Sequence, residues 1–227
     1  MRILLVHGWG YGPDIWNSVI PQLDPEIECT IADLGFSGTM KLPTGHYDIA
    51  VGHSMGLLWL LSKEKVSWDK LVSINGFTKF SASDDFPQGV SARVLERMIR
   101  KIPHSAQGVL KSFHAQCDPL GIVPFKSLAN LDEERMIWGL EFLRDMDLRN
   151  KYDPSNTLVL AEKDDLVITQ EMTSALFQES EIRWVEGKGH LVPLSAPNVC
   201  CKIIERAISE RVSGRVSGRV SGHRVSG

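Results

Sequence analysis

The sequence predicts an α/β protein built on a mostly parallel sheet of about six strands. Short runs rich in β-branched residues recur along the chain, and amphipathic stretches of helical length separate most of them, as in parallel α/β folds. With 227 residues, of which 43% are hydrophobic and 23% charged, the chain can also bury a sizeable core.

Six runs have the composition of buried strands, and these strands are expected at 2–6, 27–32, 47–53, 70–75, 157–162 and 182–186. Amphipathic periods predict helices at 13–23, 55–65, 169–178 and 195–209. The stretch 37–46 is too short for a full helix, so we expect a loop between the strands that it joins.

Residues 78–151 interrupt this alternation because only helical periods occur there. Val94, Met98 and Ile102 recur four residues apart, and aromatic residues are spread over the whole segment. The aromatic residues could simply pack the segment onto the sheet. An insertion after the carboxyl end of the fourth strand also covers a site at that edge, so we expect a helical lid.

The flanking residues 1–77 and 152–210 are expected to form one core domain. From Arg211 the chain repeats Arg-Val-Ser-Gly, a basic low-complexity pattern without the apolar density that folding requires. We therefore expect residues 211–227 to be a disordered tail.

Charge and cysteine content exclude several classes of function. A net charge of −3 provides no overall field for nucleic acid or an anionic membrane, so neither is an expected partner. The four cysteines have neither zinc-site nor disulfide-framework spacing, and we expect no metal and no cofactor. No stretch reads as a signal peptide or a membrane span, which predicts a cytoplasmic protein.

The segment "VGHSMG" at 51–56 places a serine between two glycines. Gly52 and Gly56 suit a sharp strand-to-helix turn because they carry no Cβ atoms to clash, and such a turn exposes the hydroxyl of Ser54. A buried strand precedes the motif and an apolar helix start follows it, as this turn requires. The motif is short enough to occur by chance, so its meaning depends on partner residues.

A serine hydroxyl needs a base, and the base needs a carboxylate that fixes its tautomer. His190 lies in a glycine-flanked loop after the last expected strand, and Asp164 follows the strand before it. The chain order Ser54, Asp164, His190 therefore predicts a catalytic triad. We favour Asp164 because it lies three residues beyond the end of that strand, and the adjacent Asp165 stays open as the alternative acid.

Two backbone amides are candidates to bind the oxyanion that forms when the serine attacks a carbonyl. Met55 follows the nucleophile at a helix start. Trp9 lies in "HGWG" after the first strand, where flanking glycines let the backbone approach a substrate. The Trp9 side chain is expected to line the substrate pocket.

Together, "HGWG", "GHSMG", "KDD" and "GKGH" resemble the motifs of the α/β-hydrolase superfamily over residues 1 to 209. The resemblance implies the α/β-hydrolase fold, here without the leading hairpin common in the family. It also implies the same triad and amide roles. Leu57 departs from the glycine that often follows the serine turn, which puts the local helix packing in doubt.

A narrower likeness lies in "HGWG", "FSASDDFP" at 80–87 and "GLEFLRDMDLR" at 139–149, which look like the pimeloyl-[acyl-carrier protein] methyl ester esterases of biotin synthesis. This resemblance implies a serine carboxylic-ester hydrolase that releases methanol from an acyl chain held on acyl carrier protein. It implies Phe113 as an acyl-chain contact. Gly108 and Ser112 stand where the family would have carrier-binding arginines.

A different basic cluster could hold an acidic carrier protein, and its members are Arg93, Arg97, Arg100, Lys101 and Lys111. The first four recur at helical spacing, which predicts one basic face opposite the apolar Val94, Met98 and Ile102. Most basic helix faces of this kind are simply exposed to solvent. This one would also attract an acidic partner protein and orient its approach.

Two other readings remain open from the sequence. The same triad supports hydrolysis of small esters, cleavage of carbon–carbon bonds and lyase chemistry. The chain could also be a ligand-binding protein that has the hydrolase fold but does not catalyse a reaction. Against this reading, every expected catalytic position is occupied, and a protein that only binds a ligand has no chemical need for all of these residues.

Overall fold

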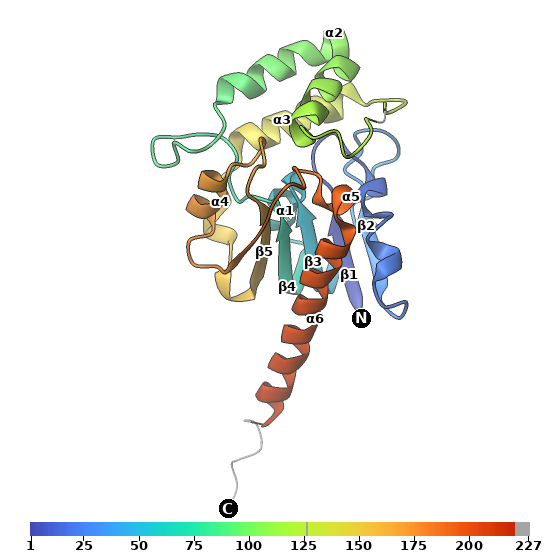
Figure 1. Cartoon of the computed structure of the whole chain (residues 1–227), viewed down its shortest axis with the longest axis vertical. Coiled ribbons are helices and arrows are strands. Elements are labelled where there is room, and N and C mark those ends of the chain that lie inside the picture. The colour runs from blue at the N-terminus through green and yellow to red at the C-terminus, as the bar shows by residue number, and fades with distance from the viewer. Residues whose placement is uncertain (126, 221–227) are drawn as a thin grey trace, which may run out of the picture.

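The computed structural model describes residues 1–125 and 127–220 of the chain. Six strands form one sheet with the order β2-β1-β3-β4-β5-β6, and each neighbouring pair is parallel (Figure 1). Their bounds are β1 (Arg2–Val6), β2 (Glu28–Ala32), β3 (Gly45–His53), β4 (Val66–Ile74), β5 (Thr157–Glu162) and β6 (Ile182–Val185). The predicted six-stranded α/β architecture is confirmed.

The central strands are buried on both faces, which explains their near-continuous apolar composition. Side chains alternate along β1, so Ile3 and Leu5 belong to one apolar cluster while Leu4 and Val6 belong to the other. The first cluster includes residues of the long C-terminal helix α6 (Pro197–Val220), and the second includes Met55 and residues 57–61 of α1 (Met55–Leu61).

The expected helix over 13–23 is replaced by two short 3₁₀ helices, Pro13–Trp16 and Ile20–Gln22. Pro21 explains the break, because a proline inside a helix lacks the N–H that the ladder needs and clashes with the preceding turn. The helices expected at 169–178 and 195–209 correspond to α4 (Gln170–Leu176) and α6.

Between β4 and β5 the chain forms α2 (Ala92–Cys117) and α3 (Glu133–Asp145), which lie above the carboxyl ends of the strands (Figure 1). We call residues 78–151 the helical insertion. Helix α2 is two arms rather than one rod, because Ser105 has non-helical dihedrals (φ −165°, ψ 68°) shortly after Pro103. The second arm folds back along the first.

Helix α6 continues to Val220, so residues 211–220 are helical where a disordered tail was expected. Arg211, the first residue of the expected tail, is held against the sheet, because its buried guanidinium forms ion pairs with Asp48 and Asp69. The rest of the predicted tail, residues 221–227 with His223, lies outside the described residues. Within the described part, no helix has both the length and the apolar character needed to cross a membrane.

Short elements complete the connections around the sheet. Helix α5 (Val192–Ser195) follows the loop that leaves β6, and two further 3₁₀ helices, Arg149–Lys151 and Pro154–Asn156, lead from the helical insertion into β5. The stretch 37–46 contains no helix and ends in β3, as expected from its length.

Candidate active site

Ser54 occupies the turn between β3 and α1 with a strained backbone (φ 54°, ψ −127°). Residues other than glycine adopt such dihedrals only when the surrounding structure imposes them. Residues strained in this way are concentrated at functional sites. The flanking glycines permit the turn: a Cβ at Gly52 would lie 2.5 Å from the Leu57 backbone, and one at Gly56 would lie 2.4 Å from the Val6 carbonyl oxygen. The motif therefore has the backbone geometry expected of it.

His190 lies between Ser54 and Asp165. Its Nε2 is 2.9 Å from the Ser54 hydroxyl oxygen, and its Nδ1 is 2.6 Å from Asp165 Oδ2. All three side chains are buried. A carboxylate only accepts, so the Nδ1–H of the neutral ring donates to Asp165, and Nε2 is left to accept the serine proton.

The prediction of Asp164 as the acid of the triad is wrong. The structure places Asp165, the alternative acid, against His190 and leaves Asp164 exposed. Asp165 Oδ1 accepts hydrogen bonds from the N–H groups of Val167 (2.7 Å) and Ile168 (3.1 Å), which turn this carboxylate inward. Glu162, at the end of β5, is also buried, and burial raises the pKa of its carboxyl.

Two histidines outside the triad also have defined positions. The Nε2–H of His53 donates to the His190 carbonyl oxygen (3.0 Å), and burial, with the nearby His190, lowers the pKa of His53 to about 3. His7 accepts the Leu34 N–H at Nε2 (3.0 Å), so its Nδ1–H donates to the Gly8 carbonyl (2.9 Å). His7 thereby holds the loop that carries Trp9.

That loop lies directly against the serine. A Cβ at Gly8 would be 2.9 Å from Ser54 Cβ and 3.2 Å from its hydroxyl oxygen. Among the hydrogen bonds of the described residues, none is donated by the backbone N–H of Trp9 or Met55. Neither candidate amide therefore has a partner among the described residues. Met55 follows the nucleophile in the sequence, and the loop of Trp9 lies beside it in space.

The side chain of Trp9 is anchored under the helical insertion. Its Nε1–H donates to the Met136 carbonyl oxygen on α3 (2.9 Å), and its ring meets Phe113 edge to face at 5.0 Å between centroids. Phe113 belongs to the second arm of α2. Trp9, the expected wall of the substrate pocket, is therefore in contact with Phe113, the expected acyl-chain contact.

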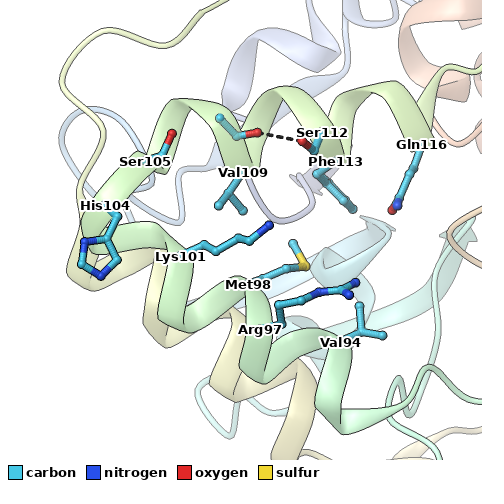
Figure 2. A pocket seen from close by; sticks show the side chains of 11 residues that line it. Val94, Arg97, Met98, Lys101, His104, Ser105, Val109, Ser112, Phe113 and Gln116 are labelled. Atoms are coloured by element: carbon cyan, nitrogen blue, oxygen red, sulfur yellow. Dashed lines mark hydrogen bonds between the residues drawn. The ribbon is translucent and has the colours of Figure 1, made fainter.

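A groove of about 450 Å³ lies between the two arms of α2 (Figure 2). Arg97, Lys101, Met98 and Val94 line it from the first arm, and Phe113 is among the residues that line it from the second.

The predicted separation of basic and apolar faces on this helix is wrong. Val94 and Met98 share the groove with Arg97 and Lys101, whereas Ile102 is buried in the core cluster. The groove exists because the helix folds back at Ser105. The spacing of basic and apolar residues along the sequence does not predict this fold-back. The other three basic residues are exposed and do not line the groove, namely Arg93, Arg100 and Lys111.

Asn75 is a site residue that the sequence analysis missed. It is buried after β4, and its side-chain amide donates to the His190 carbonyl oxygen (3.0 Å). The signal was the pair Asn75-Gly76 directly after a strand, which is typical of a turn with a left-handed residue.

Comparison with known proteins gives consistent results for the fold. No protein-family model matches the chain. The pimeloyl-[acyl-carrier protein] methyl ester esterase of Legionella pneumophila (strain Corby) is 27% identical over 167 residues, covering 66% of this chain and 69% of that protein.

Solved structures match nearly the whole chain. Bromoperoxidase from Bacillus anthracis superposes with a TM-score of 0.74 at 16% identity, covering 92% of this chain and 91% of the other. An esterase from Exiguobacterium antarcticum gives 0.72 at 20% identity, covering 93% and 91%. The chain has the α/β-hydrolase fold.

Proposed function

We propose that the chain is a serine carboxylic-ester hydrolase that works through an acyl-enzyme on Ser54. The observation that carries the proposal is the hydrogen-bonded series Ser54, His190, Asp165, which are a nucleophile, a base and an orienting carboxylate. The base nitrogen Nε2 lies 2.9 Å from the serine oxygen, and Nδ1 lies 2.6 Å from the carboxylate oxygen. Its position beside two unpartnered amides supports acyl transfer over proton abstraction alone.

In the first half-reaction, Ser54 Oγ bonds to the ester carbonyl carbon while its proton passes to His190 Nε2. The oxyanion accepts hydrogen bonds from the N–H groups of Trp9 and Met55, each worth about two to three orders of magnitude in rate. Collapse breaks the ester C–O bond, and the alcohol departs with the proton from His190.

In the second half-reaction, His190 takes a proton from water as the water oxygen attacks the acyl-enzyme. The intermediate collapses, the carboxylic acid leaves, and the proton returns to Ser54. Asp165 stays ionised throughout and stabilises the imidazolium that forms twice in each cycle.

The proposed substrate is the methyl ester of a pimeloyl chain carried by acyl carrier protein. The likeness to the Legionella esterase supports this class. Phe113 lines the space between the arms of α2 and its ring contacts Trp9 beside the nucleophile, whereas the triad residues do not line that space. Arg97 and Lys101 line that space one helical turn apart, and the described residues provide neither with an acidic partner. An acidic carrier would be attracted to them.

The reaction class is tested by hydrolysis of p-nitrophenyl esters of increasing chain length by the wild type and by Ser54→Ala. The proposal expects turnover by the wild type and a loss of about a millionfold in kcat in the variant. Equal rates for both proteins would contradict it, and ligand binding without turnover would favour a non-catalytic role.

The carrier is tested separately with the double variant Arg97→Glu/Lys101→Glu. Its kcat/KM on the carrier-bound methyl ester should fall at least about tenfold while small esters are spared, because steering by charge acts on association. Arg183→Glu/Lys202→Glu changes the net charge equally at exposed residues of β6 and α6 and is the matched control. Equal losses in both double variants would reject docking at the groove.

A further inference from the structure

Asn75 connects three parts of the site through one side chain. Its Oδ1 accepts the N–H of Glu162 at the end of β5 (2.9 Å), and its Nδ2 donates to the carbonyl oxygens of His190 (3.0 Å) and Gly189 (3.3 Å). The partner of Oδ1 is a donor and the partners of Nδ2 are acceptors, so only one orientation of the amide fits.

The backbone of His190 is held from three sides. Its carbonyl oxygen accepts from Asn75 Nδ2 and from His53 Nε2, and its N–H donates to the Cys117 carbonyl oxygen (2.7 Å). His53 comes from the end of β3, next to the nucleophile. The imidazole of His190 must remain within hydrogen-bond reach of both Ser54 and Asp165, so the placement of this backbone decides the geometry of the reaction.

We propose that Asn75 is a positioning residue for the hydrolysis. Its amide fixes the loop of His190 against the ends of β4 and β5, so that the imidazole stays between Ser54 and Asp165. This inference rests on the proposed function. A displacement of about 1 Å in a catalytic group can cost about a hundredfold in rate, and a loop released from Asn75 allows such a displacement.

The backbone of Asn75 permits informative substitutions. Its φ of 44° lies in the left-handed region, which glycine, asparagine and aspartate tolerate. Asn75→Asp retains an acceptor for the Glu162 N–H but turns a carboxylate oxygen toward two carbonyl oxygens. Asn75→Gly removes the side chain with no added backbone strain. Ser73→Ala is the matched control, because Ser73 is buried on β4 and its hydroxyl has no hydrogen-bond partner within residues 1–125 and 127–220.

The first test compares a methyl ester with the p-nitrophenyl ester of the same acyl chain. Methoxide needs a proton from His190 to leave, whereas p-nitrophenolate leaves without one. In both Asn75 variants we expect kcat on the methyl ester to fall about a hundredfold, and kcat on the p-nitrophenyl ester to fall less. We expect KM to change less than about threefold. Ser73→Ala should stay within about twofold of the wild type on both.

The second test needs no turnover. Proton NMR observes the Nδ1–H of His190 in its hydrogen bond to Asp165, and this signal should be lost or broadened in both variants and retained in Ser73→Ala. Thermal unfolding of each variant confirms that it is folded. Folded Asn75 variants that keep the signal and the wild-type ratio of methyl to p-nitrophenyl rates would overturn the inference. A wild type that hydrolyses no ester would reject the proposed function instead, and the NMR signal would then decide the role of Asn75.

Discussion

The backbone N–H of His190 donates a hydrogen bond to the carbonyl oxygen of Cys117, with 2.7 Å between the two atoms. Cys117 is the last residue of α2, so the loop that carries the imidazole is tied directly to the end of the helical insertion. Gly189 makes this approach possible, because its φ is +65° and a Cβ there would lie 2.7 Å from the same carbonyl oxygen.

Replacement of Gly189 by alanine should therefore damage the site more than its backbone strain explains. Gly187→Ala is a close control, because Gly187 has nearly the same φ (+66°) and an added Cβ there would have no described residue within 4 Å. Each variant should lose about 1–2 kcal/mol of unfolding free energy through left-handed strain. Only Gly189→Ala should also lose kcat, by about tenfold or more, measured on a p-nitrophenyl ester. Equal activity in the two variants would show that the Cys117 contact does not position His190.

Asp165→Asn should lower kcat by about ten thousandfold, because the amide presents a donor to Nδ1 or selects the wrong tautomer of His190. Asp164→Asn should retain activity within about twofold, since its side chain is exposed and does not touch the imidazole. Steady-state rates of the two variants at neutral pH decide between the carboxylates. A severe loss in Asp164→Asn with an active Asp165→Asn would reverse the assignment.

Gly8→Ala should crowd the nucleophile. The added Cβ would lie 2.9 Å from Ser54 Cβ and 3.3 Å from His53 Nδ1, so the loop carrying the Trp9 amide must move away. We expect kcat to fall about tenfold or more, because an amide displaced from the oxyanion stabilises it less. Gly12→Ala is the comparison, since its Cβ meets only Asp14 Oδ1 at 3.3 Å. Similar kcat values for both variants would argue against the oxyanion role of this loop.

His53 should make the protein less stable in acid. Burial lowers its pKa from 6.5 to about 3, so between these pH values the unfolded chain binds a proton that the folded protein does not. Its contribution is complete above pH 6.5 and is lost as the pH falls toward about 3. His53→Gln retains a donor for the His190 carbonyl and does not titrate.

Urea unfolding at pH 7 and pH 4.5 measures this effect. From pH 7 to 4.5, the wild type should lose about 2 kcal/mol more unfolding free energy than His53→Gln. Identical losses in the two proteins would mean that His53 titrates normally in the folded state.

The sequence was sufficient for features that one local motif specifies. The glycines around Ser54 predict the sharp turn, but the expected exposure of its hydroxyl is wrong, because Ser54 is buried together with His190 and Asp165. His190 followed by elimination, because only one other histidine, His223, lies beyond the candidate acids. The parallel sheet followed from the alternation of short β-branched runs with amphipathic stretches of helical length.

Features that depend on loop direction or on distant contacts were missed. Adjacent side chains such as those of Asp164 and Asp165 point to different sides, and the amides that turn Asp165 inward are fixed only by the folded loop. The fold-back of α2 at Ser105 brought basic and apolar residues into one groove. The ion pairs that hold Arg211, the first residue of the expected tail, against the sheet join residues distant in sequence.

Mass spectrometry of the protein quenched during turnover of a short-chain ester tests the covalent step most directly. A peptide containing Ser54 should carry the mass of the acyl group in the wild type, and the same peptide should remain unmodified in Ser54→Ala. Rapid ester hydrolysis with the acyl group on another residue, or an undiminished rate in Ser54→Ala, would contradict the assignment of Ser54 as the nucleophile.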